Sequence, residues 1–249
     1  MKKQLLILAA MTAIVFISCS KEKIEAPQTS QPEEIAGARG GGGGVLGTSL
    51  NMGLLGRFEF NGNLNDTTGQ INPGTPVAGK PIYGADRKGV RNSAIQFDEK
   101  YGVMMYDVPL DTNMSVSFWM KYDMTPGDVS VAIVEGSRSF TFIHQDHNKF
   151  LGGYWNFTTP AYVISKPLAN TWHHMAATRD NNTYKFYIDG KLVGSSGIQT
   201  PGIDPITTSE YNLGYCFNAG YRYWKGSLDD LRIYRRVISA TEVQALFNL

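Results

Sequence analysis

The chain has 249 residues, of which 42% are hydrophobic and 18% are charged, and its formal net charge at pH 7 is +1. This balance is typical of a globular protein. Because acidic and basic residues are nearly equal in number, the chain has no electrostatic reason to bind nucleic acid or an anionic membrane surface, and we expect neither as a partner.

The first residues have the features of an export signal. Two lysines precede the apolar run 5–17, which is too short to span a bilayer but suits a signal peptide. The run ends in Phe-Ile-Ser-Cys at 16–19, which resembles the lipobox of bacterial lipoproteins. That resemblance implies that residues 1–18 are removed and that a lipid on Cys19 anchors the protein in the bacterial cell envelope. The charged residues Lys21, Glu22 and Lys23 resemble the surface-export signals of some Gram-negative lipoproteins, which favours the outer membrane and the cell surface. The alternative is an ordinary signal peptide with an incidental cysteine.

A linker is expected next, over residues 19–49. This segment is rich in Pro, Gln, Glu and Ser and then runs through the uninterrupted glycines 40–44, which predicts a flexible tether. The glycine run lacks the preceding strand and the following Gly-Lys-Ser/Thr of a phosphate loop. Cys216 is the only other cysteine, so no disulfide is expected, and we interpret it as a small buried residue.

Residues 50–249 are enough for one domain and are composed of short strands and turns. Asp189-Gly190 predicts a tight reversal between two strands, and Ser239 with Glu242 forms a capping box that opens a short helix. Alternating apolar and polar residues predict strands at 55–60, 93–98, 103–106, 114–121, 130–135, 139–144, 152–157, 175–179, 184–188, 191–193, 211–215 and 226–234. The pattern predicts an all-β fold, a two-sheet antiparallel sandwich or jelly roll with a short C-terminal helix.

Several of these segments follow one another in the order of a known family. They are 58–69 (FEFNGNLNDTTG), 92–98 (NSAIQFD), 114–121 (MSVSFWMK), 171–178 (TWHHMAAT), 184–194 (YKFYIDGKLVG), 212–215 (NLGY) and 225–246 (KGSLDDLRIYRRVISATEVQAL). Together they resemble the laminin-G-like jelly rolls of the concanavalin A-like lectin and glucanase superfamily. The resemblance implies two antiparallel sheets packed face to face, with the first and last strands side by side.

The same superfamily includes glycoside hydrolases, so catalysis has to be considered. A retaining glycosidase needs two carboxyl groups about 5 Å apart. The hydrolase branch of the family carries them on one strand as Glu-x-Asp-x-x-Glu, and this sequence lacks that pattern. Glu135 is the nearest candidate, but no second acid is spaced for it, and we interpret it as a solvated residue at a strand end. We therefore expect no catalytic residue and no enzyme.

A structural calcium ion is suggested by two acids in the first and last family segments. Asp66 and Asp229 could bridge one Ca²⁺ if their strands are neighbours, because calcium prefers carboxylate and carbonyl oxygens. The alternative is that Asp66 caps a turn through its own backbone and that Asp229 bonds to a loop.

Sugar recognition needs aromatic faces for the ring and polar groups for the hydroxyls. Two groups of residues in expected loops offer both, and Tyr101 and Tyr106, which flank a short strand, add further aromatic rings. The groups are Tyr154, Trp155 and Asn156 with the nearby His144 and Asp146, and Tyr221, Tyr223 and Trp224. Alternation cannot bury every residue of 221–224, which favours a surface role, although burial in the core is the alternative for each aromatic residue.

These observations predict a non-catalytic, lectin-like module that is anchored to a membrane through its lipid only and binds a polysaccharide or other glycan. Two alternatives stay open. The domain could bind a protein in adhesion or assembly, since laminin-G-like domains also bind proteins, or it could be a glycoside hydrolase whose site the sequence does not reveal.

Overall fold

The computed structural model describes residues 50–123, 131–136, 139–145, 149–154, 162–164, 169–180, 183–197, 208–216 and 222–249, all within one compact unit. The predicted signal peptide 1–18, the lipidation site Cys19 and the tether to residue 49 lie outside these residues. No helix in the described part of the chain is long and apolar enough to cross a membrane.

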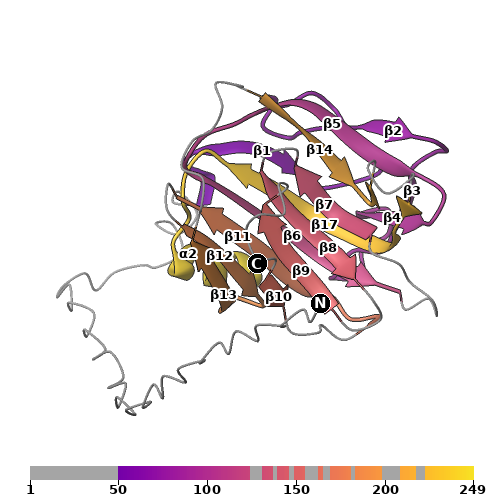
Figure 1. Ribbon diagram of the computed structural model, residues 1–249. Coiled ribbons are helices and arrows are strands. Elements are labelled where there is room, and N and C mark those ends of the chain that lie inside the picture. The colour runs from indigo at the N-terminus through magenta and orange to yellow at the C-terminus, as the bar shows by residue number, and fades with distance from the viewer. Residues whose placement is uncertain are drawn as a thin grey trace, which may run out of the picture. The chain divides into compact units, whose positions relative to one another are not determined.

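The described strands form two antiparallel sheets packed face to face (Figure 1). Sheet A has the spatial order β13 (Lys191–Gly197), β12 (Thr183–Ile188), β11 (His173–Arg179), β6 (Met114–Tyr122), β17 (Lys225–Tyr234), β4 (Ala94–Asp98) and β3 (Ile82–Gly84), with β1 (Leu54–Phe58) also paired to β17. Sheet B has the order β10 (Tyr162–Ile164), β9 (Lys149–Tyr154), β8 (Phe140–Gln145), β7 (Val131–Gly136), β14 (Thr208–Leu213), β5 (Gly102–Pro109) and β2 (Thr75–Val77). The predicted two-sheet sandwich is therefore confirmed.

The first and last strands of the domain lie side by side, as the family resemblance implied. β1 runs antiparallel to β17, with Phe58 opposite Leu231. A bulge interrupts the pairing of β17 with β6 between Asp229 and Arg232, and Asp230 within it has a φ of +46°. The bulge keeps Leu231 in the core while the two aspartates stay on the outer face.

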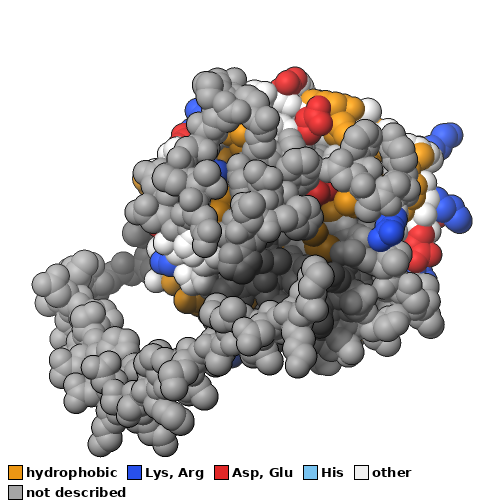
Figure 2. Space-filling view, viewed as in Figure 1, with side chains coloured by type: hydrophobic (Ala, Val, Ile, Leu, Met, Phe, Trp, Pro, Cys, Tyr) orange, Lys and Arg blue, Asp and Glu red, His pale blue; other side chains and the backbone are white. Residues whose placement is uncertain are grey.

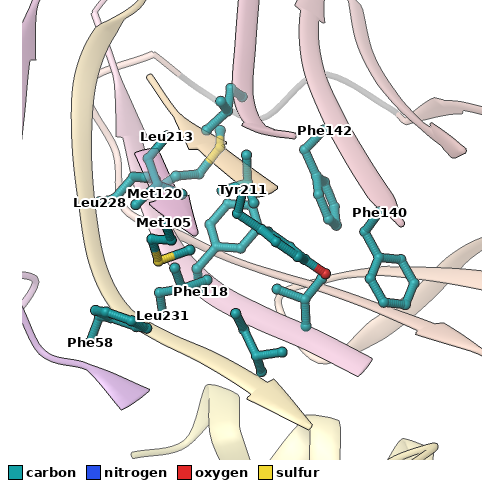
Figure 3. Packing of buried hydrophobic residues seen from close by; sticks show 14 of the residues in the cluster. Phe58, Met105, Phe118, Met120, Phe140, Phe142, Tyr211, Leu213, Leu228 and Leu231 are labelled. Atoms are coloured by element: carbon teal, nitrogen blue, oxygen red, sulfur yellow. The ribbon is translucent and has the colours of Figure 1, made fainter. Parts of the chain in front are cut away.

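The core lies between the two sheets and is built from alternate residues of each strand. In β6 the inward residues are Met114, Val116, Phe118 and Met120, none more than 1% exposed. The ring of Phe118 meets the edge of Phe142 from sheet B, with ring centres 4.9 Å apart, and Figure 3 shows both rings beside Tyr211. Each such pair buries large apolar surfaces, and this burial is the main force that joins the sheets.

A second, smaller cluster forms on the outer face of sheet A under the helix α2 (Ala240–Phe247). Val243 and Leu246 of the helix pack on Tyr234 and Ala176 of the sheet. The predicted capping box is confirmed, because Ser239 Oγ accepts from the Glu242 amide at 3.2 Å and the Ser239 amide donates to Glu242 Oε2 at 2.8 Å.

A short hairpin beside sheet B completes the described structure. It pairs β15 (Tyr215–Cys216) with β16 (Arg222–Tyr223). Cys216, which we interpreted as buried, is half-buried in β15. The hairpin brings two tyrosines onto the outer face of sheet B, where the candidate site lies.

Candidate functional site

A row of polar side chains crosses the outer face of sheet B. Glu135 on β7 lies opposite Thr141 on β8 and, on its other side, opposite Asn212 on β14. The core residues next to them in the chain are Val134, Phe142 and Leu213. Because successive side chains of a strand point to opposite faces, the polar row lies on the outer face. Glu135 is 5% exposed, so our interpretation of it as a solvated residue was wrong.

This row contains polar atoms that are buried without a hydrogen-bond partner. Within the described residues, Thr141 Oγ1, Asn212 Oδ1 and the hydroxyl of Tyr215 each have less than 1 Å² of accessible surface and no partner. An unsatisfied buried polar group costs about 1–3 kcal/mol, so such groups are rare unless water or a ligand completes them. Three such atoms along one row mark this face as a candidate binding site.

Tyr215 closes one side of the row. Gly214, with a φ of +70°, turns the chain so that the Tyr215 ring lies over β5, where a Cβ on Gly102 would be 2.2 Å from ring atom Cδ1. The ring of Tyr223 packs beside it, with ring centres 6.1 Å apart. Burial, with smaller contributions from Tyr106 and Glu210, raises the pKa of Tyr215. The hydroxyl therefore stays protonated and can donate a hydrogen bond.

The exposed side of this site lies toward β5 and β14. Tyr106 is 40% exposed, Glu210 is exposed, and Met104 is half-buried opposite Asn212. Figure 2 shows hydrophobic and acidic side chains together over these two strands. A ligand on this side contacts the exposed ring of Tyr106, and the unpartnered hydroxyl and amide groups of the row lie beneath the surface. Such a surface can bind a molecule that carries several hydroxyl groups.

A polar cavity of about 150 Å³ lies on the outer face of sheet A. Its lining residues are Arg57, Glu59, Asn61, Asp86, Arg87, Lys88, Ser93, Asp229 and Asp230. Arg87 pairs with Asp229 and lies over the ring of Trp119, 5.0 Å from its centre. Arg232 holds Asp230 through two bonds of 2.9 and 3.0 Å, and Arg57 reaches it at 3.2 Å.

The two aspartates of this cavity respond differently to their surroundings. Burial raises the pKa of Asp229 to about 6, although Arg87 opposes the shift. Burial acts in the same direction on Asp230, but Arg232 and Arg57 hold its pKa below the usual value. With guanidinium groups already paired to both carboxylates, the cavity has the character of a structural ion-pair network that fixes loop 84–93 on the sheet.

Asp66, one of the two predicted calcium ligands, accepts hydrogen bonds on both carboxylate oxygens. Asp66 Oδ1 accepts from the amides of Arg57 and Thr68 at 2.7 and 2.9 Å. Its Oδ2 accepts from Thr68 Oγ1 and from the amides of Gln70 and Ile71 at 2.6, 2.8 and 2.9 Å. These donors occupy the acceptor positions of the carboxylate. The described residues contain no group of three or more His, Cys, Asp or Glu side chains placed for a metal, and Asp66 acts as a turn cap.

Trp224 is not a surface residue, which corrects our prediction for it. It is 2% exposed, lies in the core cluster, and packs near Phe97 with ring centres 5.9 Å apart. The reason is that residue 224 lies between β16 and β17, where its amide donates to the Gly214 carbonyl at 2.7 Å and the side chain turns inward. Tyr223, by contrast, is half-buried on the candidate face.

The remaining predicted ligand residues are only partly described. His144 lies at a register position opposite Val131 and Phe150, and Tyr154 lies opposite Phe140 at the end of β9. The side chains of both, and the whole of Asp146, Trp155, Asn156 and Tyr221, lie outside the described residues. Their role in binding stays a prediction.

The residues that define the candidate site were not predicted from the sequence. Thr141, Asn212 and Tyr215 fall inside segments that we assigned to strands and to the family framework. The sequence did indicate their outward position, because Thr141 and Asn212 are polar residues with core residues on both sides in the chain. Alternation alone does not show that they come together, because their strands are paired through long-range contacts.

Comparison with known proteins agrees with this architecture. The model of a laminin G family, described as "Concanavalin A-like lectin/glucanases superfamily", matches residues 91–244. Among solved structures, domain 4 of AbnA, a GH43 extracellular arabinanase from Geobacillus stearothermophilus in complex with arabinotriose, is 23% identical, with a TM-score of 0.62 and coverage of 78% of this chain and 97% of that one.

Two botulinum neurotoxin structures are also similar, and the chain spans about half of their length. The first concerns neurotoxin type C and its interaction with two ganglioside molecules, with 12% identity, a TM-score of 0.63, and coverage of 81% of this chain and 52% of that one. The second is the binding domain of neurotoxin DC in complex with rat synaptotagmin II, with 13% identity, a TM-score of 0.60, and coverage of 80% and 52%. No curated protein matches the chain in sequence. The matched family segment and the two-sheet architecture together show that this chain belongs to the concanavalin A-like lectin/glucanases superfamily, as a laminin-G-type jelly roll.

Proposed function

We propose that this domain is a non-catalytic carbohydrate-binding module that holds a glycan on the outer face of sheet B. The observation that carries the proposal is the row of buried, unpartnered polar atoms on Thr141, Asn212 and Tyr215. A site built this way favours a ligand whose hydroxyl groups complete its hydrogen bonds, and it penalises one that leaves them unpaired. The exposed ring of Tyr106 supplies an apolar surface for the ligand.

The similar structures support a binding role of this kind. The arabinanase domain is described in complex with arabinotriose, and cell entry of neurotoxin type C is described as dependent on two ganglioside molecules. One neurotoxin binding domain is described with a protein, rat synaptotagmin II, so protein binding is the alternative that the experiment has to separate.

A catalytic role has less support. Glycoside hydrolysis needs a second carboxyl group near the first. The cross-strand neighbours of Glu135 in the row are Thr141 and Asn212, and neither is an acid. The row therefore offers recognition groups on both sides of Glu135, which favours a binding module.

A glycan array tests the proposal with the full-length chain in detergent. We expect retention of at least one glycan by the unchanged protein. Tyr215→Phe is expected to weaken retention about tenfold or more with an unchanged or higher Tm, because the lost hydroxyl has no partner in the described structure. Tyr211→Phe is the matched control: its hydroxyl is bonded to Ser139 in the core, so we expect a lower Tm and unchanged retention.

Two results would overturn this proposal. A blank array across plant, host and microbial glycans would favour the protein-binding alternative. Equal retention by Tyr215→Phe and the unchanged protein would show that water, and not a sugar hydroxyl, completes this face.

We also propose that a lipid on Cys19 anchors the domain in the bacterial cell envelope, at the outer membrane and facing outward. The lipobox-like sequence at 16–19 after an apolar run supports the anchor, and the resemblance of Lys21, Glu22 and Lys23 to surface-export signals supports the outward orientation. Cys19→Ala is expected to move the protein from the membrane fraction to the soluble fraction. Digestion of the unchanged protein by protease added to intact cells would support surface display, and complete protection would contradict it.

A further inference from the structure

The orientation of the Asn212 side chain is set by its neighbour. Asn212 Nδ2 lies 3.5 Å from Glu135 Oε2, across the paired strands β14 and β7. The NH₂ end of the amide faces Glu135, where Nδ2 donates to the carboxyl oxygen Oε2. The reversed amide would place two acceptors against each other. Glu135 therefore directs the carbonyl end of Asn212 away from itself.

The carbonyl oxygen that results is an acceptor of fixed position. Asn212 Oδ1 is buried and has no hydrogen-bond partner in the described structure. Only a hydrogen-bond donor can satisfy this oxygen, such as a hydroxyl, an amide N–H or an amine. The hydroxyls of Thr141 and Tyr215 can each donate or accept, so they do not make this distinction. Asn212 Oδ1 is therefore the atom in the row that distinguishes a ligand group that can donate a hydrogen bond from one that can only accept.

From this arrangement we infer that the Glu135–Asn212 pair makes the site select for a donor, so that it takes neutral glycans with free hydroxyl groups and rejects sulfated and O-methylated ones. The inference rests on the proposed glycan-binding function. A sulfate or methoxy group at Asn212 would present only acceptors and would leave Oδ1 unpaired. In this account Asn212 contacts the sugar and Glu135 is a positioning residue that acts through Asn212.

Affinity electrophoresis of the full-length chain tests the inference. Arabinan, galactan, xylan and dextran serve as probes, each as the neutral polymer and as its sulfated and O-methylated derivatives. We expect retardation by at least one neutral polymer to exceed that by its derivatives about tenfold or more. The inference is overturned if a neutral polymer and its sulfated derivative retard the protein equally.

Two variants separate positioning from a merely structural role. In Glu135→Gln the new amide can donate a hydrogen bond, so the side-chain amide of Asn212 can take either orientation. The ratio of retardation by the neutral polymer to retardation by its derivatives should then fall toward one. Asn212→Leu should lose retardation by the neutral polymer with a modestly lower Tm, because the buried Glu135 loses its Nδ2 donor. A Glu135→Gln variant that weakens all probes in equal proportion would contradict the positioning role.

The outcomes also distinguish this inference from the function on which it rests. If the array retains a glycan but the neutral and derivatised forms of the probes behave alike, donor selection fails and the carbohydrate-binding function stands. If no probe retards the protein and the array is blank, both fail together.

Discussion

The ring of Tyr215 occupies the space in which a side chain on residue 102 would stand, since a Cβ on Gly102 would lie 2.2 Å from Tyr215 Cδ1. The two residues belong to different sheets, Gly102 to β5 and Tyr215 to the hairpin strand β15. The tyrosine can lie over β5 only because this position is a glycine. The shape of the candidate glycan face thus depends on a residue that itself has no group to bind a ligand.

We predict that Gly102→Ala lowers both stability and glycan retention. The added methyl group meets the Tyr215 ring, and crowding of this kind typically costs about 1–3 kcal/mol. Gly84→Ala is the control, because its Cβ would meet the end of the flexible, exposed Gln96 side chain at 3.1 Å. Thermal melts and array retention of both variants check this, and a Gly102→Ala protein with unchanged Tm would contradict the close contact.

Truncation of Trp224 should act on the fold. Trp224→Ala removes a core side chain that is 2% exposed, and such changes typically cost about 3–5 kcal/mol. Tyr106→Ala removes a ring that is 40% exposed, so we expect little change in stability and weaker glycan retention. Denaturant unfolding measures the first effect and the array the second. A Trp224→Ala protein with unchanged stability would show that this residue is not part of the core.

Stability is expected to fall in mild acid through His174. This residue is 1% exposed, and burial lowers the pKa of its imidazole to about 4 although Asp230 and Asp189 oppose the shift. Between pH 6.5 and about 4, His174 is protonated in the unfolded chain but stays neutral in the folded chain. The free energy of unfolding therefore decreases as the pH falls through this range. A shift of this size corresponds to about 3 kcal/mol at most.

Two variants check the sign of this pH dependence. His174→Gln removes the titrating group, so the unfolding free energy should vary less between pH 7 and pH 4. Asp229→Asn should have the reverse effect. Burial raises the pKa of Asp229 to about 6, so the folded state gains a proton first, and this carboxyl favours the fold as the pH falls from 6 toward 3.8. Parallel pH profiles for the unchanged protein and both variants would contradict these assignments.

Removal of divalent cations is expected to leave the melting temperature unchanged. Asp66, the predicted calcium ligand, is already bonded to backbone amides and to Thr68. Asp66→Asn should nevertheless lower stability by about 1–3 kcal/mol, since an NH₂ group would face backbone donors. Melts with EDTA, then with added Ca²⁺, check the first point. A fall in Tm with EDTA that Ca²⁺ restores would show a cation site.

Much of the fold was predictable from local pattern. Alternation in 114–121 identified β6 and its inward side, because one face of that strand packs on sheet B and the period of two is preserved. The reversal at Asp189-Gly190 was predictable because both residues take positive φ, at +48° and +77°. The short strands β2 and β3 were not predicted, since three residues are too few to display a period.

The candidate site was less predictable, because its residues come from distant parts of the chain. Trp224 shows the difficulty: its neighbours in sequence suggested an exposed loop, but the chain between β16 and β17 turns it into the core. Glu135 shows the reverse, since a residue at the end of an apparent strand proved to be buried between Thr141 and Asn212.

The amino-acid sequence by itself determined the fold class, the family and the C-terminal helix cap, because alternation, turn residues and caps act between residues close in the chain. Tertiary structure alone decided which polar side chains meet. Strand pairing placed Thr141, Glu135 and Asn212 in one row, and the turn at Gly214 placed Tyr215 beside it. Such a row depends on register between strands far apart in the sequence, and register is fixed only when the whole core packs.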